Sequence, residues 1–176
     1  MKGKKGSPAD RVVKTLAPHL IKKGIIESDS QIEVVGQRRI VIKFDKAFEK
    51  ARKVVERCHV SILEQYIQQG KGFDYEQTEY YKRLMKYRKV GDSVRTLNPE
   101  WFFDLYEKIK TEGLREDRNP VILCDLYECD IKDLGWRWHR ANGTHRLAIA
   151  KVLGIAKIPV VLVTIQIKGG QDERKD

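Results

Sequence analysis

The chain has 176 residues, about the length of one domain, and 41% of them are hydrophobic, which is enough to form a core. Its 35 lysines and arginines outnumber its 25 aspartates and glutamates. The formal net charge of +10 favours either an anionic partner or simply a basic, solvated surface. No apolar run approaches the roughly 18–20 residues of a membrane-spanning helix, and the charged N-terminus lacks a signal peptide's apolar stretch. We therefore expect a cytoplasmic protein that does not bind a membrane.

The N-terminal region begins with a basic tail and a helix. Residues 1–7 are rich in lysine and glycine, and we expect them to be disordered. Ser7 can cap a helix that has Pro8 in its first position, where a missing N–H group costs nothing. Apolar residues at helical spacing extend this helix to about Lys23.

Two β-branched runs follow, at residues 31–35 and 39–44, on either side of Gly36 and Gln37. Their alternation and the turn residues between them predict a β-hairpin. A helix followed by a basic hairpin is also typical of a winged DNA-binding module. Only one clear helix precedes the hairpin, so this alternative is the weaker one.

Two further helices are predicted, over residues 45–69 and 74–88, the second with Asp74 as its N-cap. The second helix interleaves tyrosines with basic residues, a pattern that suits stacking on a nucleotide or on nucleic acid. The same pattern fits an amphipathic helix with its tyrosines packed inward, which we favour. His59 lies inside the first helix, and the sequence assigns it no role.

The second half of the chain alternates helices with strands. Asn98 can cap a helix that Gly113 ends. Residues 120–124 and 136–140 are expected to be paired strands. The apolar, β-branched run at 158–163 is expected to be a strand buried on both faces.

Three cysteines indicate a reducing compartment. They are Cys58, Cys124 and Cys129. Their odd number and the absence of a Cys-x-x-Cys pair argue against a disulfide scaffold. No second pair with the spacing of zinc ligands exists, so we expect no metal site.

A tight turn at residues 141–144 opens the helix before that last strand. Asn142 and Gly143 tolerate positive φ, the Thr144 hydroxyl can cap the helix, and Gly154 can end it.

A helix start of this kind is a candidate anion site, because its N–H groups lack partners and the helix dipole is positive there. His145 and Arg146 lie in the first turn, where a cation costs about 0.3–1 kcal/mol unless an anion binds beside it. An ordinary capped helix with a solvated Arg146 is the alternative. On these physical grounds alone the two interpretations are evenly matched.

A set of short motifs carries a family resemblance. They are Asn142-Gly143-Thr144-His145-Arg146-Leu147-Ala148, Ala150-Lys151, Leu153-Gly154 and Ile158-Pro159-Val160. In order and spacing they resemble the signature of the ParB/sulfiredoxin-like superfamily. The predicted helix at 101–114 and the strand after Pro120 resemble that family's upstream elements, so the likeness covers about residues 98–165.

The resemblance implies an α+β fold, an α/β-type ParB/sulfiredoxin-like domain with a mixed sheet, after a mostly helical N-terminal region. Four segments are expected. They are a disordered basic tail at 1–7, an N-terminal helical region with a β-hairpin at 8–92, the ParB/sulfiredoxin-like domain at 93–168 and a disordered C-terminal tail at 169–176.

In this superfamily the loop and helix start bind nucleotide phosphates: CTP in partitioning proteins, ATP or ADP in free-serine kinases, and ATP in sulfiredoxins. Thr144 stands where sulfiredoxins have their catalytic cysteine, so the resemblance does not extend to sulfinic-acid reduction. The turn Gly143-Thr144-His145-Arg146 is closer to the Gly-His-His-Arg type of the kinases than to the Gly-Glu-Arg-Arg of partitioning proteins. No helix-turn-helix follows, so we do not expect centromere binding by that route.

We therefore predict a nucleotide- or phosphate-binding site at this loop. Its residues are Asn142, Gly143, Thr144, His145 and Arg146, with Arg140 and Trp138 as accessory groups. His145 is a candidate general acid–base catalyst, and phosphoryl transfer or nucleotide hydrolysis would also require Mg²⁺. The alternatives are a DNA-binding protein whose loop holds backbone phosphate and a ParB-like nuclease. The sequence leaves open whether the chain is an enzyme and whether it forms a homodimer.

Overall fold

The computed structural model describes residues 6–45, 57–86, 99–115, 121–126 and 138–168. Four strands form one mixed sheet in the order β1-β4-β2-β3. They are β1 (Ile32–Lys43), β2 (Val121–Leu126), β3 (Trp138–Asn142) and β4 (Lys157–Ile167). Strand β4 runs antiparallel to β1 and parallel to β2, and β3 runs antiparallel to β2. The predicted α+β class with a mixed sheet is confirmed.

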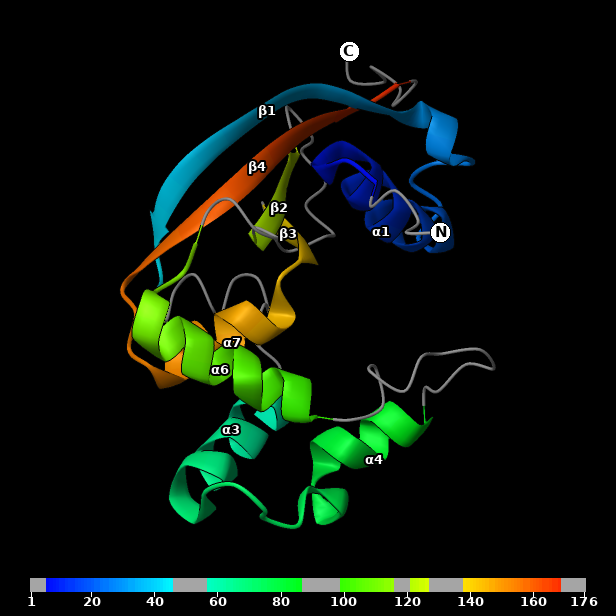
Figure 1. Cartoon of the computed structure of the whole chain (residues 1–176). Coiled ribbons are helices and arrows are strands. Elements are labelled where there is room, and N and C mark those ends of the chain that lie inside the picture. Colours follow the sequence, from blue (N-terminus) through cyan, green and yellow to red (C-terminus); the bar gives the residue numbers. More distant parts are fainter. Residues whose placement is uncertain (1–5, 46–56, 87–98, 116–120, 127–137, 169–176) are drawn as a thin grey trace.

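Helices pack on both faces of the sheet. They are α1 (Pro8–Lys22), α3 (Arg57–Gln69), α4 (Glu79–Lys86), α6 (Glu100–Glu112) and α7 (Thr144–Val152), with short 3-10 turns η1 (Asp29–Gln31) and η2 (Tyr75–Gln77). Figure 1 shows α1 near one end of the arc formed by β1 and β4 and α7 near the other. Helix α1 packs on one face and α7 on the other, while α3, α4 and α6 form a helical layer beyond α7. None of the helices in the described residues is long and apolar enough to span a bilayer.

Helix α7 is buried on two sides. Leu147 and Ala150 face the sheet and pack with apolar residues of β2 and β4. Ala148 and Ile149 face the helical layer, and all four side chains are fully buried. Because two cores hold this helix, its N-terminus has a fixed position relative to both the sheet and the helical layer.

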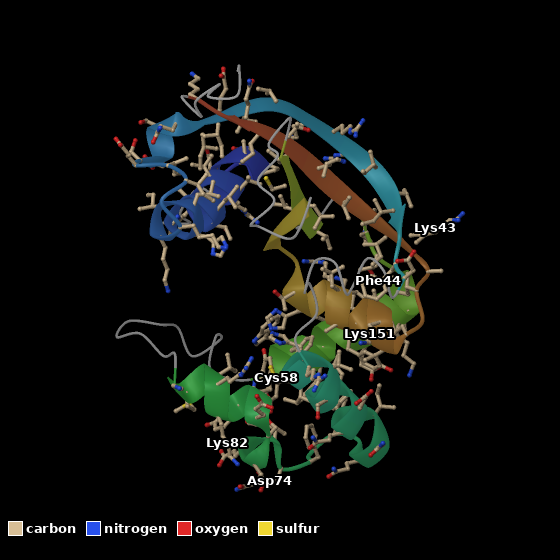
Figure 2. All side chains as sticks on the ribbon, turned by 180° about the vertical axis from the view of Figure 1, so that it is seen from behind. Lys43, Phe44, Cys58, Asp74, Lys82 and Lys151 are labelled. Carbon is tan, nitrogen blue, oxygen red and sulfur yellow. The ribbon has the colours of Figure 1, made fainter. Side chains whose placement is uncertain are left out.

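Strand β4 alternates between the two cores of the sheet. Ile158, Val160 and Leu162 face α7, whereas Val161 and Val163 belong to the core that α1 covers. The prediction of a strand buried on both faces is confirmed. Phe44, which follows β1, packs at the border of the core between the sheet and α7. Figure 2 shows it near Lys151, which lies in the last turn of α7.

The prediction of a hairpin between residues 31 and 44 is wrong. Strand β1 is a single strand of 12 residues at the edge of the sheet, paired with β4 along its length. A β-bulge between Val34 and Gly36 changes the register, so Gly36 marks a bulge rather than a turn. The bulge reverses the alternation of faces, and Ile32 and Ile42 therefore enter opposite cores. The winged-module alternative depended on that hairpin and is not supported.

Several predicted helix ends are confirmed. The Ser7 hydroxyl accepts from the Asp10 N–H at 3.1 Å, and the Asp10 carboxylate accepts from the Ser7 N–H at 2.8 Å. These reciprocal bonds form a capping box at the start of α1. Gly113 and Gly154, with φ of 75° and 64°, follow the last turns of α6 and α7.

Other ends differ from the prediction. The helix predicted from Asp74 begins as the short turn η2, which Asp74 caps, and α4 starts only after Thr78. Thr78 Oγ1 accepts from the Tyr81 N–H at 3.2 Å and so provides the cap of α4. The predicted cap Asn98, the first part of the helix predicted over 45–69 and most of both predicted tails lie outside the described residues.

Gly143 links β3 to α7 with a backbone that only glycine adopts readily. Its φ is 107°, and an added Cβ would lie 2.9 Å from Val121 Cγ2 and 3.0 Å from Val121 Cα. Gly143 itself occupies the N-cap position, and Thr144 is the first helical residue. The prediction of Thr144 as N-cap is therefore wrong, because the turn is one residue shorter than expected.

We predict that Gly143→Ala lowers the free energy of unfolding more than Gly154→Ala does. Both changes impose a left-handed backbone on alanine, which costs about 1–2 kcal/mol. An added Cβ at Gly154 meets no atom within 4 Å, whereas at Gly143 it collides with Val121 and adds about 1–3 kcal/mol. Urea denaturation of both variants measures the difference, and equal losses would show that β2 yields to the added methyl group.

Candidate functional site

The N-terminus of α7 presents backbone donors. The first bond of the helix runs from the Leu147 N–H to the Gly143 carbonyl at 2.9 Å. Gly143 is the N-cap residue, and it has no side chain that could accept hydrogen bonds from the amides of the first helical turn. Within the residues that the structure describes, the N–H groups of Thr144 and Arg146 have no hydrogen-bond partner. Such amides at the positive end of a helix dipole suit an anion.

Arg146 brings a cation to the same turn. Its side chain is partly buried, and burial lowers the pKa of the guanidinium because desolvation penalises the charged form. No carboxylate within the described part of the chain forms an ion pair with it. A guanidinium remains protonated at neutral pH, so this turn holds a partly desolvated positive charge beside unpaired amides.

His145 points into the helical layer rather than toward that charge. Its ring lies 4.6 Å from the rings of both Trp101 and Phe102, measured between centroids, and its Nε2 is 2.7 Å from the Tyr80 hydroxyl. These contacts join α7 to α4 and α6. They give His145 a structural role, and the acid–base role predicted for it stays a prediction.

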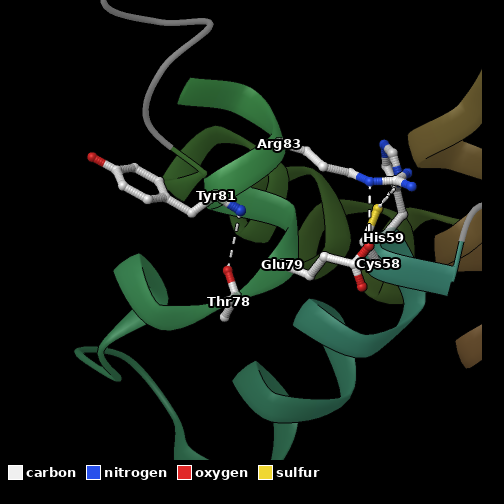
Figure 3. Close-up of polar contacts among 6 residues, drawn as sticks. All are labelled: Cys58, His59, Thr78, Glu79, Tyr81 and Arg83. Carbon is white, nitrogen blue, oxygen red and sulfur yellow. Dashed lines mark hydrogen bonds and ion pairs between the residues drawn. The ribbon is translucent and has the colours of Figure 1, made fainter. Parts of the chain in front are cut away.

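A second polar cluster lies next to His145, and the sequence did not predict it. Cys58 Sγ is 3.5 Å from His59 Nδ1, and Arg83 Nη1 donates to Cys58 Sγ at 3.6 Å (Figure 3). Arg83 Nε also pairs with a carboxylate oxygen of Glu79 at 3.3 Å. The His59 ring is 4.7 Å from that of His145. The thiol of Cys58 is therefore buried and in contact with both His59 and Arg83.

The predicted site residues on β3 are placed by their backbone alone. Asn142 pairs with Ile122, and Arg140 and Trp138 pair with Leu123 and Asp125. The strand thus brings Asn142 directly to the start of α7, and the side chains of these three residues lie outside the described part of the structure. Among the described side chains, no group of three or more His, Cys, Asp or Glu could hold a metal ion.

Comparison of the chain with protein-family models, with curated proteins and with solved structures finds no match. The likeness to the ParB/sulfiredoxin-like superfamily therefore rests on the sequence motifs alone. The geometry of the α7 N-terminus stands independently of that likeness. It consists of open backbone amides and of Arg146, which lacks an ion-pair partner within the described residues.

We predict that Tyr80→Phe destabilises the protein by about 1–3 kcal/mol, because it removes the hydroxyl that pairs with the partly buried His145 imidazole. Tyr81→Phe is the matched control, since the Tyr81 hydroxyl has no hydrogen bond within the described residues; its cost should stay within about 0.5 kcal/mol. Urea denaturation checks both values. Similar small losses in both variants would show that the Tyr80–His145 bond does not anchor α7.

Proposed function

We propose that the chain binds a nucleotide and holds its phosphates at the N-terminus of α7. One observation carries this proposal: the partly desolvated guanidinium of Arg146 has no carboxylate partner within the described residues and lies beside open backbone amides. A guanidinium fork matches two phosphate oxygens, and a helix N-terminus supplies further donors. The motif resemblance adds support, because the corresponding loop of that superfamily binds nucleotide phosphates.

The contacts of His145 define its part in this proposal. Its ring is held by Tyr80, Trp101 and Phe102, so it positions the loop and leaves phosphate binding to Arg146 and the amides. Phosphoryl transfer would require Mg²⁺ and a carboxylate positioned beside the nucleotide. The proposal therefore concerns nucleotide binding and not catalysis, with ATP, ADP and CTP as the ligands that the motif resemblance suggests.

We expect a nucleotide to raise the midpoint of thermal unfolding, and Arg146→Ala to abolish that rise. At a ligand concentration 100 times Kd, binding stabilises the folded chain by about 2.7 kcal/mol, or about 5–10 °C for a protein of this size. One plate with ATP, ADP, CTP and GTP, each with Mg²⁺, measures this. Arg39→Ala is the matched control, because it removes the same charge from the exposed edge strand β1.

The two variants give opposite results if the proposal is correct. Arg39→Ala should keep the full nucleotide response of the wild type, whereas Arg146→Ala should lose it. Equal responses in both variants, or no stabilisation by any of the four nucleotides, would contradict the proposal.

Binding to the DNA backbone is the second candidate, and the exposed basic residues on β1 favour it. Arg38, Arg39 and Lys43 lie exposed along this strand, in a chain with a net charge of +10. In that case duplex DNA binding should fall steeply with salt and ignore nucleotide. Fluorescence anisotropy distinguishes the candidates, because Arg39→Ala would then weaken binding at least as much as Arg146→Ala.

A further inference from the structure

A cavity of about 200 Å³ lies in the helical layer, between the loop after α3 and helix α6. It shares no lining residue with the α7 site. Four aromatic side chains form its walls: Tyr66, Phe73, Tyr75 and Phe103. The rings contact one another. Between ring centroids, Tyr66 is stacked on Phe103 at 4.3 Å, and Phe73 lies 5.5 Å from Phe103. Figure 2 shows Asp74, the neighbour of Phe73, at the end of the molecule away from the sheet.

The polar lining of the cavity is mainly acidic. Glu100 and Asp104 lie one turn apart on α6, so their carboxylates share one side of the helix. Lys71 contributes a positive charge from the loop opposite, and within the described residues it forms no ion pair with either carboxylate. Both carboxylates can interact favourably with a cation bound in the cavity.

The pKa values of the two lining tyrosines are both raised, first by burial and then by nearby carboxylates. The pKa of Tyr75 is raised by burial and then by the carboxylates of Glu100 and Glu76. The pKa of Tyr66 is raised by burial and then by Glu107 and Asp104. Among the described residues that line the cavity, two carboxylates thus face a single cation, Lys71.

We propose that this cavity binds a small alkylated ammonium group, with the aromatic walls around its methyl groups and Glu100 and Asp104 balancing its charge. Aromatic faces and carboxylates together attract a soft, weakly hydrated cation. Nucleotides and other anions are repelled by the two carboxylates. The volume lies below the roughly 300–1,000 Å³ of pockets for larger ligands, which selects a compact group.

The positive charge of Lys71 opposes the binding of a cation in this cavity. Lys71 lies between Gly70 and Gly72, whose φ values are 78° and 96°, and it lines the same cavity as Glu100 and Asp104. A bound cation would lie near this positive charge, which repels it. Removal of the lysine charge should therefore strengthen binding, which is the opposite of what removal of a carboxylate should do.

The test is isothermal titration calorimetry of the full chain with choline. The control ligand is the neutral isostere of choline, in which a tert-butyl group replaces the trimethylammonium group. We expect choline to bind saturably and its isostere to bind at least about fivefold more weakly. Circular dichroism of each variant confirms that it is folded.

Three variants test residues that line the cavity, and a fourth is the control. Asp104→Asn should weaken choline binding by about fivefold or more, and Tyr75→Leu should weaken it similarly by removing one aromatic wall. Lys71→Gln should strengthen binding by about twofold or more. Glu64→Gln is the control, because Glu64 is an exposed carboxylate on α3 that does not line the cavity, and it should leave the affinity unchanged.

A peptide with a trimethyllysine side chain presents the same group and forms the second arm. Binding of the peptide without choline would support the cation chemistry and assign the group to a protein side chain. Equal affinity for choline and its isostere, unchanged affinity in Asp104→Asn, or weaker binding in Lys71→Gln would overturn the proposal. So would the absence of saturable binding of both choline and the peptide to the folded wild-type chain.

Discussion

Burial of α7 between two apolar layers is the constraint on which the rest of the structure depends. Leu147 and Ala150 complete the core of the sheet, while Ala148 and Ile149 complete the core of the helical layer. The small side chains of Ala148 and Ala150 let the helix approach both layers closely. A rotation of the helix about its axis would move apolar side chains out of both cores at once. The direction in which Arg146 leaves the first turn is therefore set by packing on two sides, whether or not a ligand is bound.

The polar residues at this helix start divide between structure and recognition. His145 turns toward Tyr80 and the aromatic rings of α6, and so fastens the helix to the layer beyond it. Arg146, the next residue, is partly buried and forms no ion pair within the described residues. Gly143 is required by its close approach to Val121, so packing alone explains the glycine of the turn without a phosphate. Of the motif's residues, Arg146 thus gives the strongest physical argument for a ligand.

Local signals in the sequence predicted most elements of the second half of the chain. The glycines after α6 and α7 and the apolar run of β4 depend on neighbours within a few residues, and these predictions are confirmed, as is the Ser7 cap of α1, whereas the predicted Thr144 cap is wrong. The bulge at Gly36 could not be predicted, because glycine in a β-branched run fits a turn equally well and only the pairing with β4 distinguishes them. The partners of His145 come from α4 and α6, and the aromatic cavity joins the end of α3 to α6. No spacing within the sequence reveals such long-range neighbours.

The bulge of β1 also governs how this edge of the sheet tolerates change in length. Because the extra residue reverses the faces, deletion of Val35 would send the side chains at one end of the strand to the wrong side of the sheet. Without the bulge, the outer edge of β1 would present an unbroken row of backbone N–H and C=O groups with which a strand of another molecule could pair. Three valines of this strand, Val34, Val35 and Val41, are exposed. The bulge therefore sets the register of β1 and also interrupts its outer edge, along which Arg38 and Arg39 are exposed.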